Sequence, residues 1–293
     1  MRKEWIRLVI TVFLSTACAS TQLPAPVPSE PPISTPVEKQ GSEVQFQLWK
    51  FKFENETHSY SSITRTIIQS DQKLTANSDT LTTKADFSIT INRQQIPPAF
   101  SGQLIQFEFA AGQKTSAKQQ PIRLPLRFTG TITSGQLLLQ PTLIQPDSNL
   151  CENFETSYLN EIHTAIVSLP LRLQTGSTWT DTLSTTTCSG NKIPSIVQII
   201  RAYRVQGNVQ EANKSYLLID RAEQIHLSGS GSQNQHQVQL TGEGSGLSTI
   251  FLNPETGTLH LVKTSQRLDI TLLTSGRSYR FKQEVTQQIA LAP

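Results

Sequence analysis

The sequence has few charged residues and no concentration of positive charge. Of its 293 residues, 25 are Lys or Arg and 22 are Asp or Glu, so 16% of the chain is charged and the formal net charge is +3. Proteins that bind nucleic acid present a basic patch or stripe, because they must neutralise phosphates. No such cluster occurs along this chain. We therefore expect no nucleic-acid partner.

The sequence also lacks a catalytic or metal-binding motif. Residues 242–246 (Gly-Glu-Gly-Ser-Gly) come nearest to a nucleophile elbow, but their spacing is wrong and they lie in strand context, so the glycines indicate bulges or close packing of strands. His163 is interpreted as solvated, and Asp181 as a turn or cap residue. We predict no catalytic residues, no metal and no cofactor. The histidines are scattered and the isolated carboxylates could meet only through folding: His58, His163, His226, His236, His260, Asp86, Asp181, Asp220 and Asp269.

The N-terminus has no apolar run of membrane-spanning length. Residues 8–14 form an apolar stretch interrupted by Thr11, far short of the roughly 20 residues that a spanning helix needs. Arg2, Lys3 and Arg7 precede it, and small residues follow it. This profile is typical of a signal peptide that is removed on export. We therefore predict that residues 1–17 are a signal peptide.

The stretch Leu14-Ser15-Thr16-Ala17-Cys18 resembles the lipobox of bacterial lipoproteins, although Leu14 lies one place further from the cysteine than is most typical. The resemblance implies that Cys18 becomes the N-terminus of the mature chain and carries acyl chains such as palmitate. The membrane would then be a partner through this lipid, and the protein would be extracytoplasmic, at the cell surface or in the periplasm. The alternative is an ordinary secretory signal cut near Ala17 or Ser20.

A proline-rich segment follows Cys18. Residues 19–42 hold six of the 16 prolines, with Ser and Thr between them. Proline-rich chain favours an extended conformation of about 3.1 Å per residue, so this segment would reach on the order of 75 Å from a membrane. We predict a tether over residues 18–42 and a single folded domain over residues 43–293.

Only two cysteines remain besides Cys18. An even pair in an exported chain is readily interpreted as a disulfide, so Cys151 and Cys188 are predicted to be bonded. The alternative is two buried free thiols. Clustered His or a Cys-x-x-Cys, which a metal site would need, is missing.

Period-two alternation of apolar residues dominates residues 43–293. It is clear at Phe87-Ile89-Ile91 and in the β-branched runs 196–205 and 216–227. Turn signals follow at residues 253–257 and at Ser275-Gly276. The fold class is therefore mainly β, a large curved antiparallel sheet that forms a half-barrel or a sandwich.

One segment has helical spacing instead. Between residues 149 and 167 the apolar residues recur every three or four positions, which predicts one packed helix with a single apolar stripe. Pro170 ends it, and Cys151 would attach its first turn to Cys188. The stripe consists of Leu150, Phe154, Tyr158, Leu159, Ile162 and Ile166.

A lipidated Cys18, a proline-rich tether and a strand-rich domain with one helix are similar in outline to the half-barrel lipoprotein-carrier proteins of the bacterial envelope. That resemblance implies a non-catalytic protein that binds a hydrophobic or lipid ligand in a concave sheet, with the helix as its lid. The alternative is a structural or interaction lipoprotein for adhesion or assembly whose partner is an envelope protein. Glycan binding would require Trp49 or Trp179 to be exposed, and a hydrolase is the third hypothesis.

Overall fold

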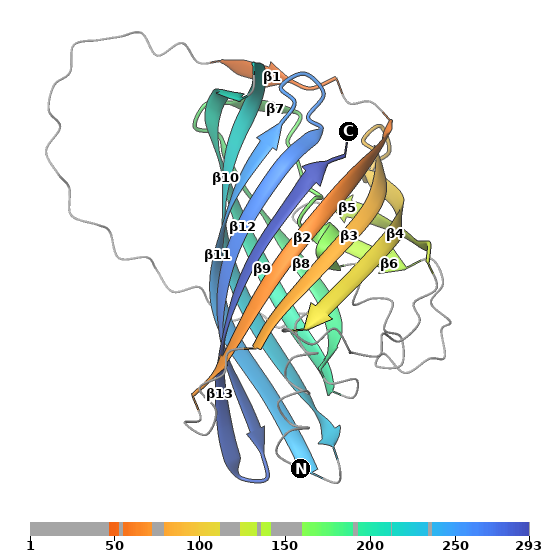
Figure 1. The fold of residues 1–293 in the computed structure, drawn as a ribbon. Coiled ribbons are helices and arrows are strands. Elements are labelled where there is room, and N and C mark those ends of the chain that lie inside the picture. The colour runs from red at the N-terminus through yellow and green to blue at the C-terminus, as the bar shows by residue number, and fades with distance from the viewer. Residues whose placement is uncertain are drawn as a thin grey trace, which may run out of the picture.

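The computed structural model describes residues 47–52, 55–71, 79–111, 124–133, 136–141, 160–189, 193–211, 213–233 and 236–292. Strands make up nearly all of this part of the chain, as Figure 1 shows. The elements are β1 (Leu48–Lys50), β2 (Thr57–Ser70), β3 (Asp79–Asn92), β4 (Ala99–Ala111), β5 (Leu126–Thr133), β6 (Gln136–Pro141), α3 (Asn160–His163), β7 (Arg172–Gln174), β8 (Thr178–Ser189), β9 (Ile193–Glu211), β10 (Lys214–Gln233), β11 (His236–Leu252), β12 (Leu259–Thr274) and β13 (Arg277–Leu291).

Eleven of the strands form one closed barrel in the order β10-β11-β12-β13-β2-β3-β4-β5-β6-β8-β9, and β9 pairs with β10 to complete it. All but one of these pairings are antiparallel. The exception is the parallel pairing of β6 with β8, which consists of two residue pairs and is the shortest strand pairing in the barrel. Strands β1 and β7 form a separate two-stranded sheet at one end (Figure 1). The predicted fold class, mainly β with a large curved antiparallel sheet, is confirmed.

The alternation of side chains fills the barrel interior with apolar residues. On β10, Leu217 and Ile219 belong to one buried cluster, and Ile225 and Leu227 to a second. Between them the inward positions are charged, so a polar band crosses the interior between two apolar halves. The buried polar residues are Ser62, Thr64, Thr66, Thr83, Ser88, His163, Asp181, Ser195, Arg201, Arg221, Glu223, Ser248, Thr264, Thr274 and Gln283.

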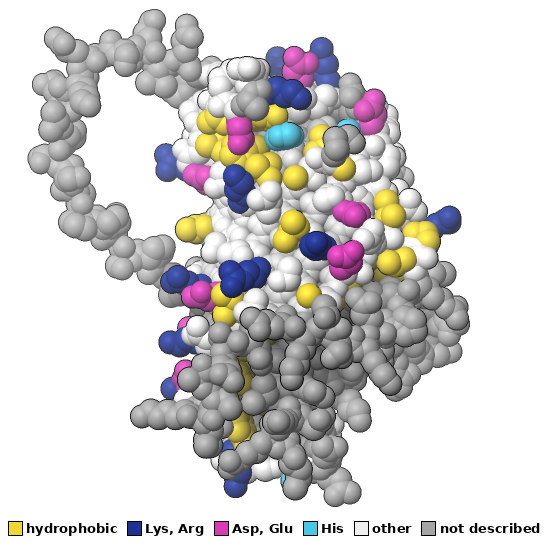
Figure 2. All heavy atoms as spheres, viewed as in Figure 1, with side chains coloured by type: hydrophobic (Ala, Val, Ile, Leu, Met, Phe, Trp, Pro, Cys, Tyr) yellow, Lys and Arg dark blue, Asp and Glu magenta, His cyan; other side chains and the backbone are white. Residues whose placement is uncertain are grey.

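The outward positions are mostly polar. Figure 2 shows one face on which uncharged polar groups dominate and charged side chains are scattered, while apolar side chains gather near one end. Two ion pairs on the outer wall, Lys84–Glu108 at 3.9 Å and Arg267–Glu284 at 3.4 Å, join strongly exposed side chains and add little stability. None of the helices among the described residues is long and apolar enough to cross a membrane.

The glycines at 242, 244 and 246 allow β11 and β12 to pack closely, as the sequence indicated. A Cβ atom at Gly246 would lie 2.7 Å from Cγ of Gln266 and 2.8 Å from Oε2 of Glu223, on the inner side of the wall. At Gly244 it would collide with the backbone oxygen of Arg267. The Gly-x-Gly-x-Gly run is therefore a structural requirement of this wall.

This packing gives a first prediction. We expect Gly246→Ala to lower the free energy of unfolding by about 1–3 kcal/mol, because the added methyl group must displace Glu223 and Gln266 in a filled interior. Ser245→Ala, at the exposed neighbouring position, should change it by less than about 0.5 kcal/mol. Urea unfolding followed by tryptophan fluorescence measures both. Equal effects of the two substitutions would contradict the close packing.

The predicted helix over residues 149–167 is found only in part. Its residues 149–159 lie outside the described residues, and α3 covers Asn160–His163. The chain then leaves the helix at Thr164, so the prediction that the helix continues to Val167 is wrong. Arginine side chains from β9, β10 and the turn after β3 bind the backbone oxygens of residues 163, 164 and 167, and the chain follows these contacts instead of a helix.

Candidate functional site in the barrel interior

A segment of the chain that is not part of the barrel wall lies inside one half of the barrel. Residues 162–169, which we call the plug, belong to the same apolar cluster as inward side chains of β2, β3, β9 and β10. The side chains of Ile162 and Ile166 are 0% exposed. Each fully buried side chain of this size contributes about 1.5–3 kcal/mol, so the plug is held mainly by apolar contact. The other buried apolar members are Ala165, Val167 and Leu169.

Three arginine side chains bind the backbone of the plug, two from the barrel wall and one, Arg93, from the turn after β3. Arg201 Nη1 donates to the His163 oxygen at 3.4 Å, and Arg221 Nη1 donates to the Thr164 oxygen at 3.4 Å. Arg93 Nη2 donates to the Val167 oxygen at 3.2 Å. These distances are long for hydrogen bonds, whereas the wall itself is held by continuous ladders. The plug is therefore attached by a few weak polar contacts.

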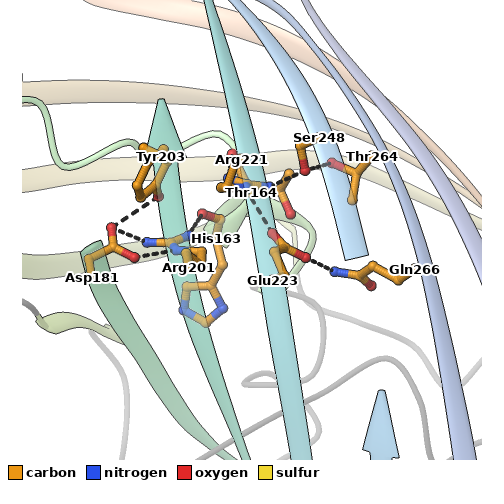
Figure 3. A network of polar contacts seen from close by, with 10 residues as sticks. All are labelled: His163, Thr164, Asp181, Arg201, Tyr203, Arg221, Glu223, Ser248, Thr264 and Gln266. Atoms are coloured by element: carbon orange, nitrogen blue, oxygen red, sulfur yellow. Dashed lines mark hydrogen bonds and ion pairs between the residues drawn. The ribbon is translucent and has the colours of Figure 1, made fainter. Parts of the chain in front are cut away.

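Arg201 is held by a carboxylate in the wall. Its Nε donates to Asp181 Oδ1 at 2.5 Å and its Nη2 to Oδ2 at 2.8 Å, while the Tyr203 hydroxyl donates to Oδ2 at 3.0 Å (Figure 3). Burial alone would lower the pKa of Arg201, but Tyr203 and Asp181 raise it above its ordinary value. Burial raises the pKa of Tyr203 to about 12. This part of the network is therefore an Arg cation, an Asp anion and a neutral phenol.

A second ion pair lies beside the first. Arg221 Nε is 2.8 Å from Glu223 Oε1, although the N–H does not align as a hydrogen bond, and Glu223 Oε2 accepts from Gln266 Nε2 at 2.6 Å. Arg221 Nη2 also donates to Ser248, whose hydroxyl is 2.9 Å from that of Thr264. The two arginines and two carboxylates balance in charge. Figure 3 shows these side chains converging from β8, β9, β10, β11 and β12.

His163 lies in the plug with its ring buried. The sequence predicted a solvated side chain, but the residue is 4% exposed, and neither ring nitrogen has a hydrogen-bond partner. Burial, helped by the charge of Arg201, lowers its pKa to about 3. The ring is therefore neutral at physiological pH, and it places an unpartnered donor and an unpartnered acceptor inside the barrel.

The described residues enclose a small cavity at the mouth of the barrel. It has a volume of about 40 Å³ and lies between the plug and the ends of β2, β3 and β12, lined in part by His58, Tyr60 and Arg93. That volume admits no more than a few water molecules. Burial lowers the pKa of Arg93 to about 10, so this side chain keeps its charge. A ligand larger than a few atoms would not fit this cavity unless the plug moved.

The structure does not bring the carboxylates singled out in the sequence together. Asp181 is buried in the ion pair with Arg201, so its interpretation as a turn or cap residue is wrong. Asp86 accepts from Ser61 on the outer wall at 2.5 Å, and Asp220 accepts from Gln206 there at 2.6 Å. Asp269 is also exposed. These four side chains do not form one pocket.

The histidines and tryptophans are likewise dispersed. His226 is exposed, and His260 stacks on Tyr216 at 4.3 Å. Trp49 is 4% exposed, and Trp179 is half-buried and stacked on Tyr203 at 4.8 Å. Among the described residues, no group of three or more His, Cys, Asp or Glu side chains is placed to hold a metal ion.

The predicted cysteine sites fall mostly outside the described residues. Cys18, with the signal peptide and tether, lies there, and so does Cys151. Cys188 lies on β8, opposite Pro194 of β9. Lipidation of Cys18 and the bond between Cys151 and Cys188 therefore stay predictions.

Sequence reasoning missed Arg201, Arg221 and Glu223. A signal for them was present, because each falls in phase with the buried residues of an alternating run, as Arg201 does between Val197 and Val205. A charged residue at an inward position of a long strand indicates a buried ion pair, since an unpaired charge would not be tolerated there.

No protein-family model matches the sequence, and no curated protein does either. Among solved structures, one similar chain is a crystal structure of Pseudomonas aeruginosa OccK2 (OpdF), with 5% sequence identity, coverage of 84% of this chain and 100% of that chain, and a TM-score of 0.25. A TM-score of 0.25 is too low to indicate a shared fold or function.

Proposed function

We propose that the chain is a non-catalytic envelope lipoprotein, anchored through Cys18, whose barrel binds a hydrophobic ligand in the place that the plug occupies. The observation that carries this proposal is the plug itself. A segment of eight residues, five of which are buried and apolar, lies in one half of the barrel interior and accepts three hydrogen bonds of 3.2–3.4 Å from arginine side chains. Such a segment occupies the volume that an acyl chain would need.

The plug and the ligand compete for the same place in the barrel, so the ligand affinity depends on how often the plug is displaced. If ligand enters only when the plug is displaced, the apparent affinity is reduced by the fraction of molecules whose plug is out. Truncating a buried plug residue raises that fraction. Truncating a buried wall residue of the other apolar cluster does not, because that residue does not pack with the plug.

Two matched substitutions test this. Ile166 in the plug is 0% exposed, and Ile270 on β12, which is 1% exposed, belongs to the other apolar cluster, away from the plug. We expect Ile166→Ala to increase the affinity for the fluorescent probe N-phenyl-1-naphthylamine about ten-fold or more, and Ile270→Ala to give no increase. The titration uses the mature chain with Cys18→Ser, which avoids detergent.

The opposing results are equally definite. Failure of every variant to bind the probe would overturn ligand binding, and equal gains in both variants would show general loosening of the barrel. Anchoring has its own measurement, the intact mass of the native mature chain. A mass without acyl chains on Cys18 would exclude the anchor.

A second candidate function is a structural or interaction module, and one observation favours it. The outer wall has a hollow of about 590 Å³ where the small side chains Ala202 and Ala222 face each other across β9 and β10, and Leu247 beside them is 70% exposed. Exposed apolar side chains around a hollow suit an envelope protein as partner. A module of this kind would bind no probe in the titration above. The buried Trp49 does not support a glycan platform.

A further inference from the structure

The ion pairs of the polar band restrict the chemistry of any ligand that replaces the plug. Arg201 is 2% exposed and Arg221 is 1% exposed, and each already has a carboxylate from a neighbouring position of the wall. The positive charge of each guanidinium is thus compensated before a ligand arrives. A second carboxylate or a phosphate in the same place would add an unbalanced anion to a buried site, which is strongly unfavourable.

The same arginines still need acceptors. In the plugged state Arg201 and Arg221 each direct one further N–H group at a backbone carbonyl of the plug, those of His163 and Thr164. When the plug leaves, these buried donors lose their partners, which costs free energy unless the ligand replaces them. A pure hydrocarbon would not replace them, whereas ester, amide or hydroxyl oxygens would.

We infer that the ligand of the barrel is an uncharged, oxygen-bearing amphiphile whose carbonyl or hydroxyl oxygens take the place of the His163 and Thr164 carbonyls beside Arg201 and Arg221. Its acyl chain follows the path of Ile162, Ile166 and Val167 along the apolar half. The inference rests on the proposed function and adds the chemical class of the ligand. Acylglycerols have this chemistry, and ionised fatty acids do not.

Substitutions that remove one charge from the polar band should change this ligand selectivity. Glu223→Gln keeps a side chain of the same shape that still accepts from Gln266 Nε2, but it removes the charge that balances Arg221. The uncompensated arginine then favours an anionic ligand. Asp181→Asn does the same for Arg201.

Competition against N-phenyl-1-naphthylamine tests the inference with two probes that share one acyl chain, 1-monooleoylglycerol and oleate, at pH 8. In the unmodified mature domain with Cys18→Ser we expect 1-monooleoylglycerol to compete at an at least ten-fold lower concentration than oleate. In Glu223→Gln the competition by oleate should improve about ten-fold, while that by 1-monooleoylglycerol stays within about two-fold. Asp181→Asn serves as the second variant if Glu223→Gln does not fold.

The outcomes separate the inference from the proposed function. Oleate that competes as well as 1-monooleoylglycerol in the unmodified domain overturns the inference while leaving ligand binding intact. Oleate binding that Arg93→Gln abolishes and Glu223→Gln leaves unchanged overturns it as well, because the headgroup would then lie at the mouth. If neither probe competes in any variant and the fluorescent probe itself does not bind, the proposed function fails.

Discussion

Replacing Arg201 by Met should lower the free energy of unfolding by about 3–5 kcal/mol, measured by urea denaturation at pH 7.5. The substitution leaves the Asp181 carboxylate buried and without its arginine partner, although the Tyr203 hydroxyl still donates to it. Asp181 is 2% exposed, so solvent does not compensate the charge. A domain of this kind has about 5–15 kcal/mol of stability in total, and the loss is therefore a large share of it.

The double substitution Arg201→Met with Asp181→Leu is the control. It removes both charges together, so most of the lost stability should return even though the plug still lacks a donor at His163. Arg204→Met, on the exposed side of the same strand, should cost less than about 0.5 kcal/mol. If the double variant is as unstable as Arg201→Met, the pair is not a self-contained unit and the interior charges are coupled more widely.

Much of the wall could be predicted from the sequence because its signal is local. Alternation such as Phe87-Ile89-Ile91 fixes which side chains face inward, and Asn253–Gly257 and Ser275-Gly276 each mark a turn between neighbouring strands. Closure could not be predicted in this way. It depends on the pairing of β13 with β2 and on the two residue pairs between β6 and β8, which join positions far apart in the chain.

The candidate site could be predicted from the sequence less well than the wall could, and the reason is physical. His163 lies off the apolar stripe of its predicted helix, and that pattern indicates a solvated residue only if the helix lies on the outside of the sheet. The segment lies inside a closed wall, where every face is buried. Asp181 was misinterpreted because its burial depends on a distant partner, Arg201, which is 20 residues away on the next strand.

Acid should destabilise the protein through His163, because the pKa of its ring is lower in the folded chain than in the unfolded chain. The ring has a pKa of about 3 in the folded chain and an ordinary value of 6.5 in the unfolded chain. Below pH 6.5 the unfolded state therefore binds a proton that the folded state does not. Stability from this group is fully present above pH 6.5 and is lost as the pH falls, by about 1.4 kcal/mol per pH unit down to about pH 3.

The substitution His163→Leu isolates this contribution from the carboxylates that also titrate in acid. The native ring nitrogens have no hydrogen-bond partners, so the variant should be at least as stable as the native chain at pH 7.5. The difference between the two unfolding free energies should then widen by about 1.4 kcal/mol for each pH unit between 6 and 4. His226→Leu, at an exposed position on β10, should leave the pH dependence unchanged.

Parallel curves for the native chain and His163→Leu would mean that the folded protein takes up the proton. The plug would then leave the interior in mild acid while the barrel stays folded, because the protonated ring is repelled by Arg201 and is stable only in water.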